Sequence, residues 1–236
     1  MAITISIAEI KQKAYELGAD LCGVASIDRF KEAPEGFHPQ DVLPSCQSVI
    51  VLASRFLKNA LEAKSTVPYT TVRNELMAQM NHRAVALSEY LEDHGAVAIP
   101  MNSTGPDEWD AKTNKFRGII SLKHAAVLAG LGKMGKNTLL VNDKYGNMIW
   151  LSGVFVGEAL PADPLASYEG CIPNCRLCLD SCPVNALDGL SINQPLCRNH
   201  AFGEYNGGEW RIKCYICRKV CPNRSGIKKL NEGELS

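Results

Sequence analysis

The most informative segment of the sequence is Cys171-Ile-Pro-Asn-Cys175-Arg-Leu-Cys178-Leu-Asp-Ser-Cys182-Pro183. Its core is repeated further along as Cys214-Tyr-Ile-Cys217-Arg-Lys-Val-Cys221-Pro222. Each copy contains C-x2-C-x3-C-P and has one more cysteine upstream, Cys171 for the first and Cys197 for the second. Eight of the ten cysteines lie in this region. The pattern is an internal duplication and predicts two equivalent metal centres.

The spacing favours two cubane 4Fe-4S clusters. Three thiolates on one short loop can bind three different irons, and in two-cluster ferredoxins the cysteine before proline binds the other cluster. Each proline lacks an amide hydrogen and ends the short helical turn that carries the ligands. We therefore expect one cluster at Cys171, Cys175, Cys178 and Cys221, and a second at Cys182, Cys197, Cys214 and Cys217.

Two other interpretations of the cysteines compete. Four disulfides would require an oxidising compartment, and the N-terminus has no signal for export. Zinc is the stronger rival, because Cys175-x2-Cys178 and Cys214-x2-Cys217 could close one tetrahedral site. Zinc would leave the repeated x3-Cys-Pro and both upstream cysteines without a role.

The totals allow a larger domain ahead of the cysteines. With 236 residues and 46% apolar content, the chain can build such a domain with its own core. Lys+Arg and Asp+Glu balance at 25 each, unlike the basic footprint of a general nucleic-acid binder. Basic residues still crowd the C-terminal part, where they can offset cluster charge or form a docking patch for an acidic electron donor or RNA. They are Arg211, Lys213, Arg218, Lys219, Arg224, Lys228 and Lys229.

The sequence predicts a cytoplasmic protein without a membrane segment. The N-terminus has no basic region and meets Glu9 early, unlike a signal peptide. The longest apolar stretch without charge, residues 146–157, is too short to span a bilayer.

We expect an α/β (α+β) N-terminal domain with a mixed sheet over residues 1–162, followed by a small two-cluster domain like a bacterial ferredoxin over 163–236. Pro161, Asp163 and Pro164 mark the linker. The apolar spacing predicts helices at 7–17, 71–94 and 121–130, and strands at 19–25, 48–53, 96–101, 138–141 and 148–156.

A glycine turn within the expected N-terminal domain nearly matches two phosphate-binding motifs. G-x-G-x-x-G should follow a strand and open a helix, but here it follows a helix and opens a β-like run. A P-loop would need Ser or Thr where Asn137 stands. We therefore exclude ATP and NAD, and expect the turn to approach a flat or phosphate-bearing cofactor. The residues expected to do so are Gly130, Gly132, Gly135, Lys136 and Asn137.

Three features together resemble the epoxyqueuosine reductase family. They are residues 129–140 (Ala-Gly-Leu-Gly-Lys-Met-Gly-Lys-Asn-Thr-Leu-Leu), the strand ending Phe155-Val-Gly-Glu158, and the eight cysteines. The resemblance implies a cobalamin-dependent reductase, in which the N-terminal domain holds a base-off corrinoid and the cluster domain passes electrons singly to cobalt. Family members reduce an epoxide in a modified nucleoside of a tRNA anticodon, by a mechanism that resembles that of reductive dehalogenases.

The chain departs from this family upstream of the glycine turn. Members carry an aspartate proton donor there, whereas this chain has Ser121-Leu-Lys123-His124. His124 is the obvious substitute because an imidazolium donates a proton near neutral pH, and Lys123 is a second candidate. The alternative is that His124 is an ordinary helix residue facing the core or solvent. The first ligand gap is also x3, where members commonly have x2.

The sequence leaves rival functions open. The interpretation carried forward is an iron-sulfur oxidoreductase that accepts electrons from a low-potential donor of the ferredoxin or flavodoxin type and acts on tRNA or another corrinoid protein. The alternative is a non-catalytic carrier with two 4Fe-4S clusters, or a corrinoid-reducing activator, that docks on a partner protein. A third is a flavin site in the N-terminal domain. Retained cobalamin would mark the enzyme, and extractable FMN the flavin site.

Overall fold

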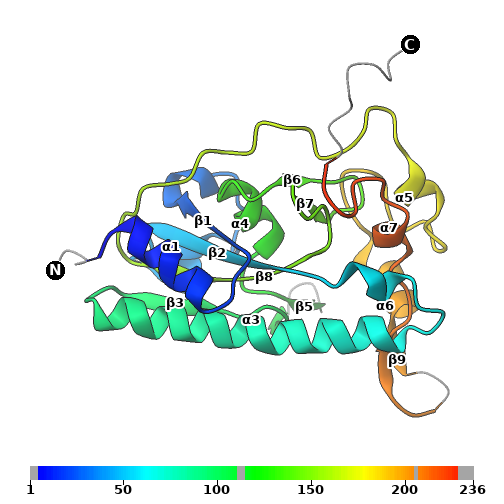
Figure 1. The fold of residues 1–236 in the computed structure, drawn as a ribbon, viewed down its shortest axis with the longest axis horizontal. Helices are drawn as coiled ribbons and strands as arrows, with labels where there is room; N and C mark the ends of the chain where they lie inside the picture. Colours follow the sequence, from blue (N-terminus) through cyan, green and yellow to red (C-terminus); the bar gives the residue numbers. More distant parts are fainter. Residues whose placement is uncertain (1–4, 111–114, 205–206, 228–236) are drawn as a thin grey trace. The chain divides into compact units, whose positions relative to one another are not determined.

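The computed structural model describes residues 5–110, 115–204 and 207–227, and divides into two compact units built from discontinuous segments (Figure 1). Unit 1 takes residues 1–55, 74–131 and 150–166. Unit 2 takes residues 56–73, 132–149 and 167–236, and therefore holds all eight duplicated cysteines.

A four-stranded sheet with the order β1-β2-β8-β3 forms the centre of unit 1. The strands are β1 (Leu21–Ser26), β2 (Ser48–Arg55), β8 (Ile149–Val156) and β3 (Ala98–Met101). β2 and β8 are almost wholly buried and rich in β-branched residues, which fit a pleated sheet packed on both faces.

The mixed sheet expected from the sequence is wrong. β1 pairs with β2 antiparallel, and so does β3 with β8. The start of β2 also lies beside the end of β8, because Gln47 N donates to Val156 O at 2.9 Å. Parallel neighbours need a crossover that usually contains a helix packed on the sheet. Between β1 and β2 there are only the short helices η1 (Ile27–Phe30) and α2 (Pro39–Val42).

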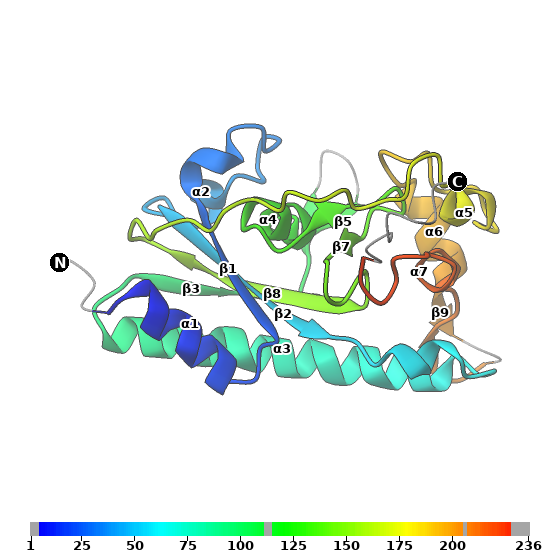
Figure 2. The same cartoon turned by 45° about the horizontal axis from the view of Figure 1, so that its top comes forward.

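Helices cover both faces of this sheet. α1 (Ile7–Glu16) and α3 (Val67–Asp93) lie on one side, and α4 (Leu122–Leu128) with α2 lies on the other (Figure 2). α1 begins with the capping box formed by Ser6 and Glu9. The core under α1 and α3 uses alternate strand residues, each contributing about 2 kcal/mol by burial; it includes Ile10, Val24, Ile50, Leu52, Met80, Leu87, Leu91 and Val154.

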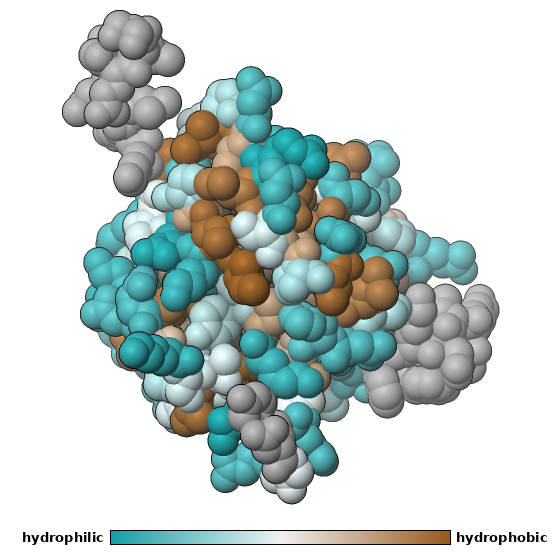
Figure 3. All heavy atoms as spheres, turned by 90° about the vertical axis from the view of Figure 1, so that its right-hand side faces the viewer, coloured by the Kyte–Doolittle hydropathy of each residue, from teal (hydrophilic) through white to brown (hydrophobic). Residues whose placement is uncertain are grey.

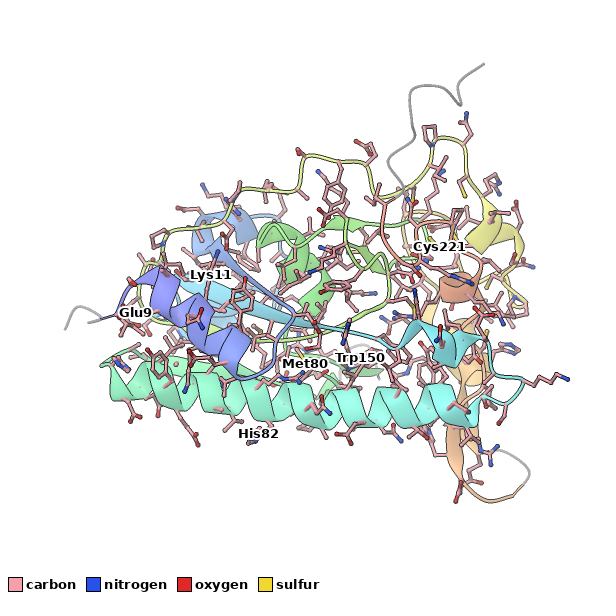
Figure 4. All side chains as sticks on the ribbon, in the orientation of Figure 1. Glu9, Lys11, Met80, His82, Trp150 and Cys221 are labelled. Carbon is pink, nitrogen blue, oxygen red and sulfur yellow. The ribbon has the colours of Figure 1, made fainter. Side chains whose placement is uncertain are left out.

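The two faces of α3 separate core from surface residues. Met80 is fully buried and points from α3 toward the sheet, whereas His82 is exposed and points away from it (Figure 4). Both follow from the helical period, since residues two apart face in nearly opposite directions. Met80 is therefore a packing residue.

The free edge of β1 is covered by the segment after β8. Asp163 N donates to Val24 O at 2.9 Å, and Val24 N donates to the Asp163 carboxylate at 2.8 Å. Lys11 of α1 forms an ion pair with the same carboxylate. These bonds satisfy backbone groups that an edge strand would otherwise leave open.

The remaining elements are short. Unit 1 also contains the antiparallel pair β4 (Glu108–Asp110) and β5 (Lys115–Arg117). Unit 2 contains η2 (Lys58–Leu61), β6 (Lys133–Met134), β7 (Leu140–Val141), α5 (Leu177–Asp180), α6 (Gln194–Ala201), β9 (Phe202–Glu204), β10 (Trp210–Ile212) and α7 (Ile216–Lys219). Within the described ranges, no helix combines the length and apolar content needed to cross a bilayer.

Candidate functional site

Four cysteines line one small cavity in unit 2. Three of them, Cys171, Cys175 and Cys178, come from the first copy of the repeat, and Cys221 comes from the second. Figure 4 labels Cys221, which follows α7. Lys136, Asn137, Val141, Ile172, Pro222 and Asn223 complete the lining. These four cysteines are the set that the spacing groups around the first cluster.

The thiols of this set influence one another electrostatically. Burial, and then the thiols of Cys171, Cys178 and Cys175, raise the pKa of Cys221 to about 11, against a hydrogen bond from the Asn223 backbone. Burial, and then Cys171 and Cys175, also raise the pKa of Cys178. Crowded thiolates repel one another, so the set is stable either as protonated thiols or when a metal centre compensates the charge.

A second group forms around Cys217. Burial, and then the thiols of Cys214 and Cys197, raise the pKa of Cys217 to about 11, although the guanidinium of Arg218 favours the thiolate. Cys182, the fourth residue expected here, accepts a hydrogen bond from Ala186 N at 3.3 Å. An amide directed at sulfur is typical of iron-sulfur ligands, whose potentials it helps to set.

Single metal ions and clusters require different geometries. Among the described residues, no group of three His, Cys, Asp or Glu side chains is arranged to hold one metal ion. A mononuclear site needs all its donors at about 2 Å from a single point, whereas a cubane gives each thiolate its own iron. The cluster assignments of all eight cysteines therefore stay predictions.

The glycine turn leads into unit 2 and contacts the cysteine segments there. Lys136 N donates to Cys171 Sγ at 3.3 Å, and Lys136 Nζ donates to Cys175 O at 2.9 Å. Asn137 Nδ2 donates to Cys217 O at 3.0 Å, and Asn137 is only 3% exposed. The donors that suggested a phosphate-bearing cofactor are therefore directed at the protein's own cysteine segments.

The three glycines are explained by close contacts, with backbone atoms at Gly130 and Gly132 and with side chains at Gly135. A Cβ on Gly130 would lie 2.1 Å from Pro164 O, and one on Gly132 would lie 2.5 Å from Val141 O. At Gly135 the nearest atom, Asn137 Oδ1, would be at 2.9 Å. The chain itself occupies the space that a side chain would need. A cofactor at these positions stays a prediction.

Among the described basic residues of the C-terminal part, Arg218 and Arg224 are engaged by contacts within unit 2. Arg218 is only 6% exposed, its guanidinium donates to Asn147 O, and it lies over the Phe56 ring at 5.6 Å from the centroid. Arg224 forms an ion pair with Glu62 at 3.1 Å. Lys228 and Lys229 lie outside the described residues. A buried guanidinium with these contacts stabilises the unit and is not available for docking.

Several apolar residues next to the cysteines in the sequence are exposed. On the face shown in Figure 3, apolar side chains lie among polar ones. Four exposed apolar residues of unit 2 are direct sequence neighbours of cysteines: Ile172, Leu177, Leu196 and Ile216. Such residues keep water from a metal site and suit contact with a partner protein.

A second cavity lies in unit 1, beside the end of β3 and the start of α4. It has a volume of about 270 Å³, and its polar lining includes Ser103, Asp107, Ser121 and Lys123. Asn81 of α3 holds the loop by accepting from Ser103 N at 2.7 Å. The volume of this cavity is close to that of the smallest small-molecule sites, about 300 Å³. It suits a ligand of nucleoside size, and a corrinoid is several times larger.

The two predicted catalytic residues differ in position. Among the described residues that line this cavity, Lys123 is present and His124 is not. The His124 Nδ1 lies 2.7 Å from Ser121 Oγ. Burial, and then the neighbouring charge of Lys123, lower the pKa of His124. The imidazole is therefore mostly neutral at pH 7 and poorly suited to donate a proton.

Asp107 is an acidic residue of the cavity lining that the sequence interpretation did not consider. It lines the cavity directly after the Gly105-Pro106 turn. The segment immediately before the glycine turn contains no acidic residue at positions 121–124, whereas Asp107 reaches the cavity from the loop after β3. The Gly-Pro turn next to it was the available signal, because such turns redirect the chain at the end of a strand.

Comparisons with known proteins identify several that this chain resembles in sequence and in fold. No family model matches the chain. An epoxyqueuosine reductase from Staphylococcus aureus is 26% identical over 261 residues, which cover 95% of this chain and 67% of that protein. The chain thus spans about two thirds of the length of this relative.

Solved structures share the fold. Epoxyqueuosine reductase from Streptococcus thermophilus superposes with a TM-score of 0.65 at 18% identity, covering 95% of this chain and 68% of that one. An epoxyqueuosine reductase solved with an epoxyqueuosine-modified tRNA-Tyr stem loop gives 0.64 at 19% identity, covering 92% and 64%. A reductive dehalogenase whose structure suggests a mechanism for B12-dependent dehalogenation gives 0.56 at 16% identity, covering 89% and 28%.

The fold and the sequence likeness together define the class of protein, which is an oxidoreductase. More particularly, the chain resembles epoxyqueuosine reductases over most of its length, in sequence and in fold. The resemblance inferred from the glycine turn and the cysteines is confirmed.

Proposed function

We propose that this chain is a cytoplasmic reductase that passes single electrons from two 4Fe-4S clusters in a ferredoxin-like domain, residues 163–236, to a cobalamin held by residues 1–162. Its substrate would be an epoxide-bearing nucleoside of tRNA or a chemically similar group. The observation that carries the proposal is the cavity lined by Cys171, Cys175, Cys178 and Cys221, in which both copies of the repeat meet.

The cysteine groups fit clusters in their donor chemistry. Each predicted set contains four thiols, and the first set also receives an amide hydrogen bond, from Lys136 N to Cys171 Sγ. Bound clusters would supply one-electron transfer at low potential. The exposed apolar residues next to the cysteines offer a contact surface for a ferredoxin or flavodoxin type of donor.

The cavity of unit 1 is the proposed substrate site. Asp107 can hold and deliver a proton to an oxygen of a bound substrate, and the Lys123 ammonium can bind an oxygen that gains negative charge. We assign no cavity residue to cobalamin. That part of the proposal is supported by the likeness to epoxyqueuosine reductases and to the B12-related dehalogenase fold.

Anaerobic purification tests the proposal. Iron and sulfide should each reach about eight per chain, because two cubanes contain four of each. The reconstituted protein should retain cobalamin and, with a reductant, reduce epoxyqueuosine in tRNA. Clusters without retained cobalamin would identify a carrier or activator, and four irons or fewer, or bound zinc, would contradict the two-cluster site.

A further inference from the structure

Two adjacent residues connect the two copies of the cysteine repeat. Lys136 contacts the first copy through Cys171 Sγ and Cys175 O, and Asn137 contacts the second through Cys217 O. Both residues lie in the turn between β6 and β7 and line the first cysteine cavity. This turn, residues 135–139, therefore links the two copies of the repeat.

The turn of residues 135–139 is oriented by hydrogen bonds within it. Asn137 Oδ1 accepts from Leu139 N at 3.2 Å, which leaves Nδ2 to donate to Cys217 O. Gly135 N donates to Leu139 O at 2.8 Å and closes the turn. These bonds fix the main chain around Lys136, so its amide stays directed at Cys171 Sγ, and its ammonium is held by Cys175 O.

The charge of Lys136 has an electrostatic consequence. A cubane with four thiolates is an anion and becomes more negative when it accepts an electron. A lysine ammonium 2.9 Å from Cys175 O, in the lining of the cavity, favours the more negative state. Lys136 should therefore raise the reduction potential of this cluster, as hydrogen bonds to its sulfurs also do.

We propose that Lys136 is a positioning residue that sets the potential of the cluster held by Cys171, Cys175, Cys178 and Cys221, and that Asn137 holds this residue in register with the second cysteine group. This inference rests on the proposed function, because it requires clusters. It gives the glycine turn a role in electron transfer, in addition to any role toward a cofactor.

Redox titration of the anaerobic protein, followed by electron paramagnetic resonance, tests the inference. Lys136→Met removes the charge but keeps the main-chain donor to Cys171. One of the two midpoint potentials should fall, so that the reduced-to-oxidised ratio at a fixed potential drops about tenfold, equivalent to about 59 mV. Lys136→Arg should keep this midpoint potential close to the wild-type value. Lys58→Met, which removes an exposed charge on η2, should change neither midpoint.

The outcomes separate this inference from the proposed function. Full iron content with unchanged midpoints in Lys136→Met would overturn the inference while leaving the clusters in place. Loss of iron in Lys136→Met but not in Lys136→Arg would show that Lys136 only stabilises the structure around the cluster, and would also overturn the inference. An iron-free wild-type protein would refute the proposed function itself, and the inference with it.

Discussion

Alanine at Gly130 tests whether the glycine turn is shaped by packing. Gly130 has φ +76°, and an added Cβ would lie 2.1 Å from Pro164 O. The left-handed conformation costs a non-glycine residue about 1–2 kcal/mol, and overpacking costs about 1–3 kcal/mol more. Alanine also restricts the unfolded chain, which offsets about 0.4–1 kcal/mol of this cost. We expect Gly130→Ala to lower the free energy of unfolding by about 2–4 kcal/mol.

Gly95→Ala is the matched control for this prediction. Gly95 lies in the same unit and has φ +85°, but among the described residues no atom lies within 4 Å of an added Cβ. It therefore isolates backbone strain, and should cost about 1 kcal/mol or less. Both variants are compared by urea unfolding of metal-free protein, followed by circular dichroism. Equal stability of the two would refute the packing argument and make a bound group the reason for Gly130.

Four further predictions follow from the structure. Cys175→Ser and Cys221→Ser should each remove the same cluster, so the double variant should bind as much iron as either single one, whereas Cys182→Ser with Cys221→Ser should lose both clusters; additive loss in the first pair would contradict the shared cavity. Cys22, whose pKa burial raises to about 12, should resist alkylation in native protein and react after unfolding, as mass spectrometry of labelled peptides would detect. Asp107→Asn should slow substrate reduction about 10²-fold or more at unchanged cofactor content, while Glu108→Gln should not; equal rates would exclude Asp107 as the acid. Partial desolvation lowers the pKa of His124 in the folded state, so the unfolded chain binds more protons below about pH 6.5 and stability falls on acidification; His124→Gln should weaken this pH dependence in thermal unfolding, and an unchanged profile would argue against a lowered pKa of this imidazole.

For the first group of four cysteines, the spacing indicated which residues lie around one cavity, and their role as ligands stays a prediction. A cubane site needs ligands on different irons, and a short loop reaches three of them. The prediction therefore paired Cys221 with the first copy of the repeat, and Cys221 does line the cavity with Cys171, Cys175 and Cys178. A constraint of this kind can be inferred from sequence because it depends on local geometry and on a known donor set.

The direction of the strands and the acidic residue at the cavity were harder to predict from the sequence. Apolar periodicity located β2 and β8, but it contains no information on whether neighbours run parallel. The direction depends on the connection, and the segment between β1 and β2 has no long helix. Asp107 was missed for a related reason, since its position depends on where the loop after β3 returns.

The glycine turn shows why a motif that nearly matches a phosphate loop has to be judged by what approaches it. A phosphate and a thiolate with its neighbouring carbonyls attract the same groups, namely backbone N–H donors and an ammonium. Lys136 presents both, and in this chain they face Cys171 Sγ and Cys175 O. The cysteine segments supply sulfur and carbonyl acceptors within the chain, so these donors are engaged without an external ligand. Added phosphate should therefore not displace them, whereas a change at Lys136 should alter the first cysteine group and the cluster proposed there.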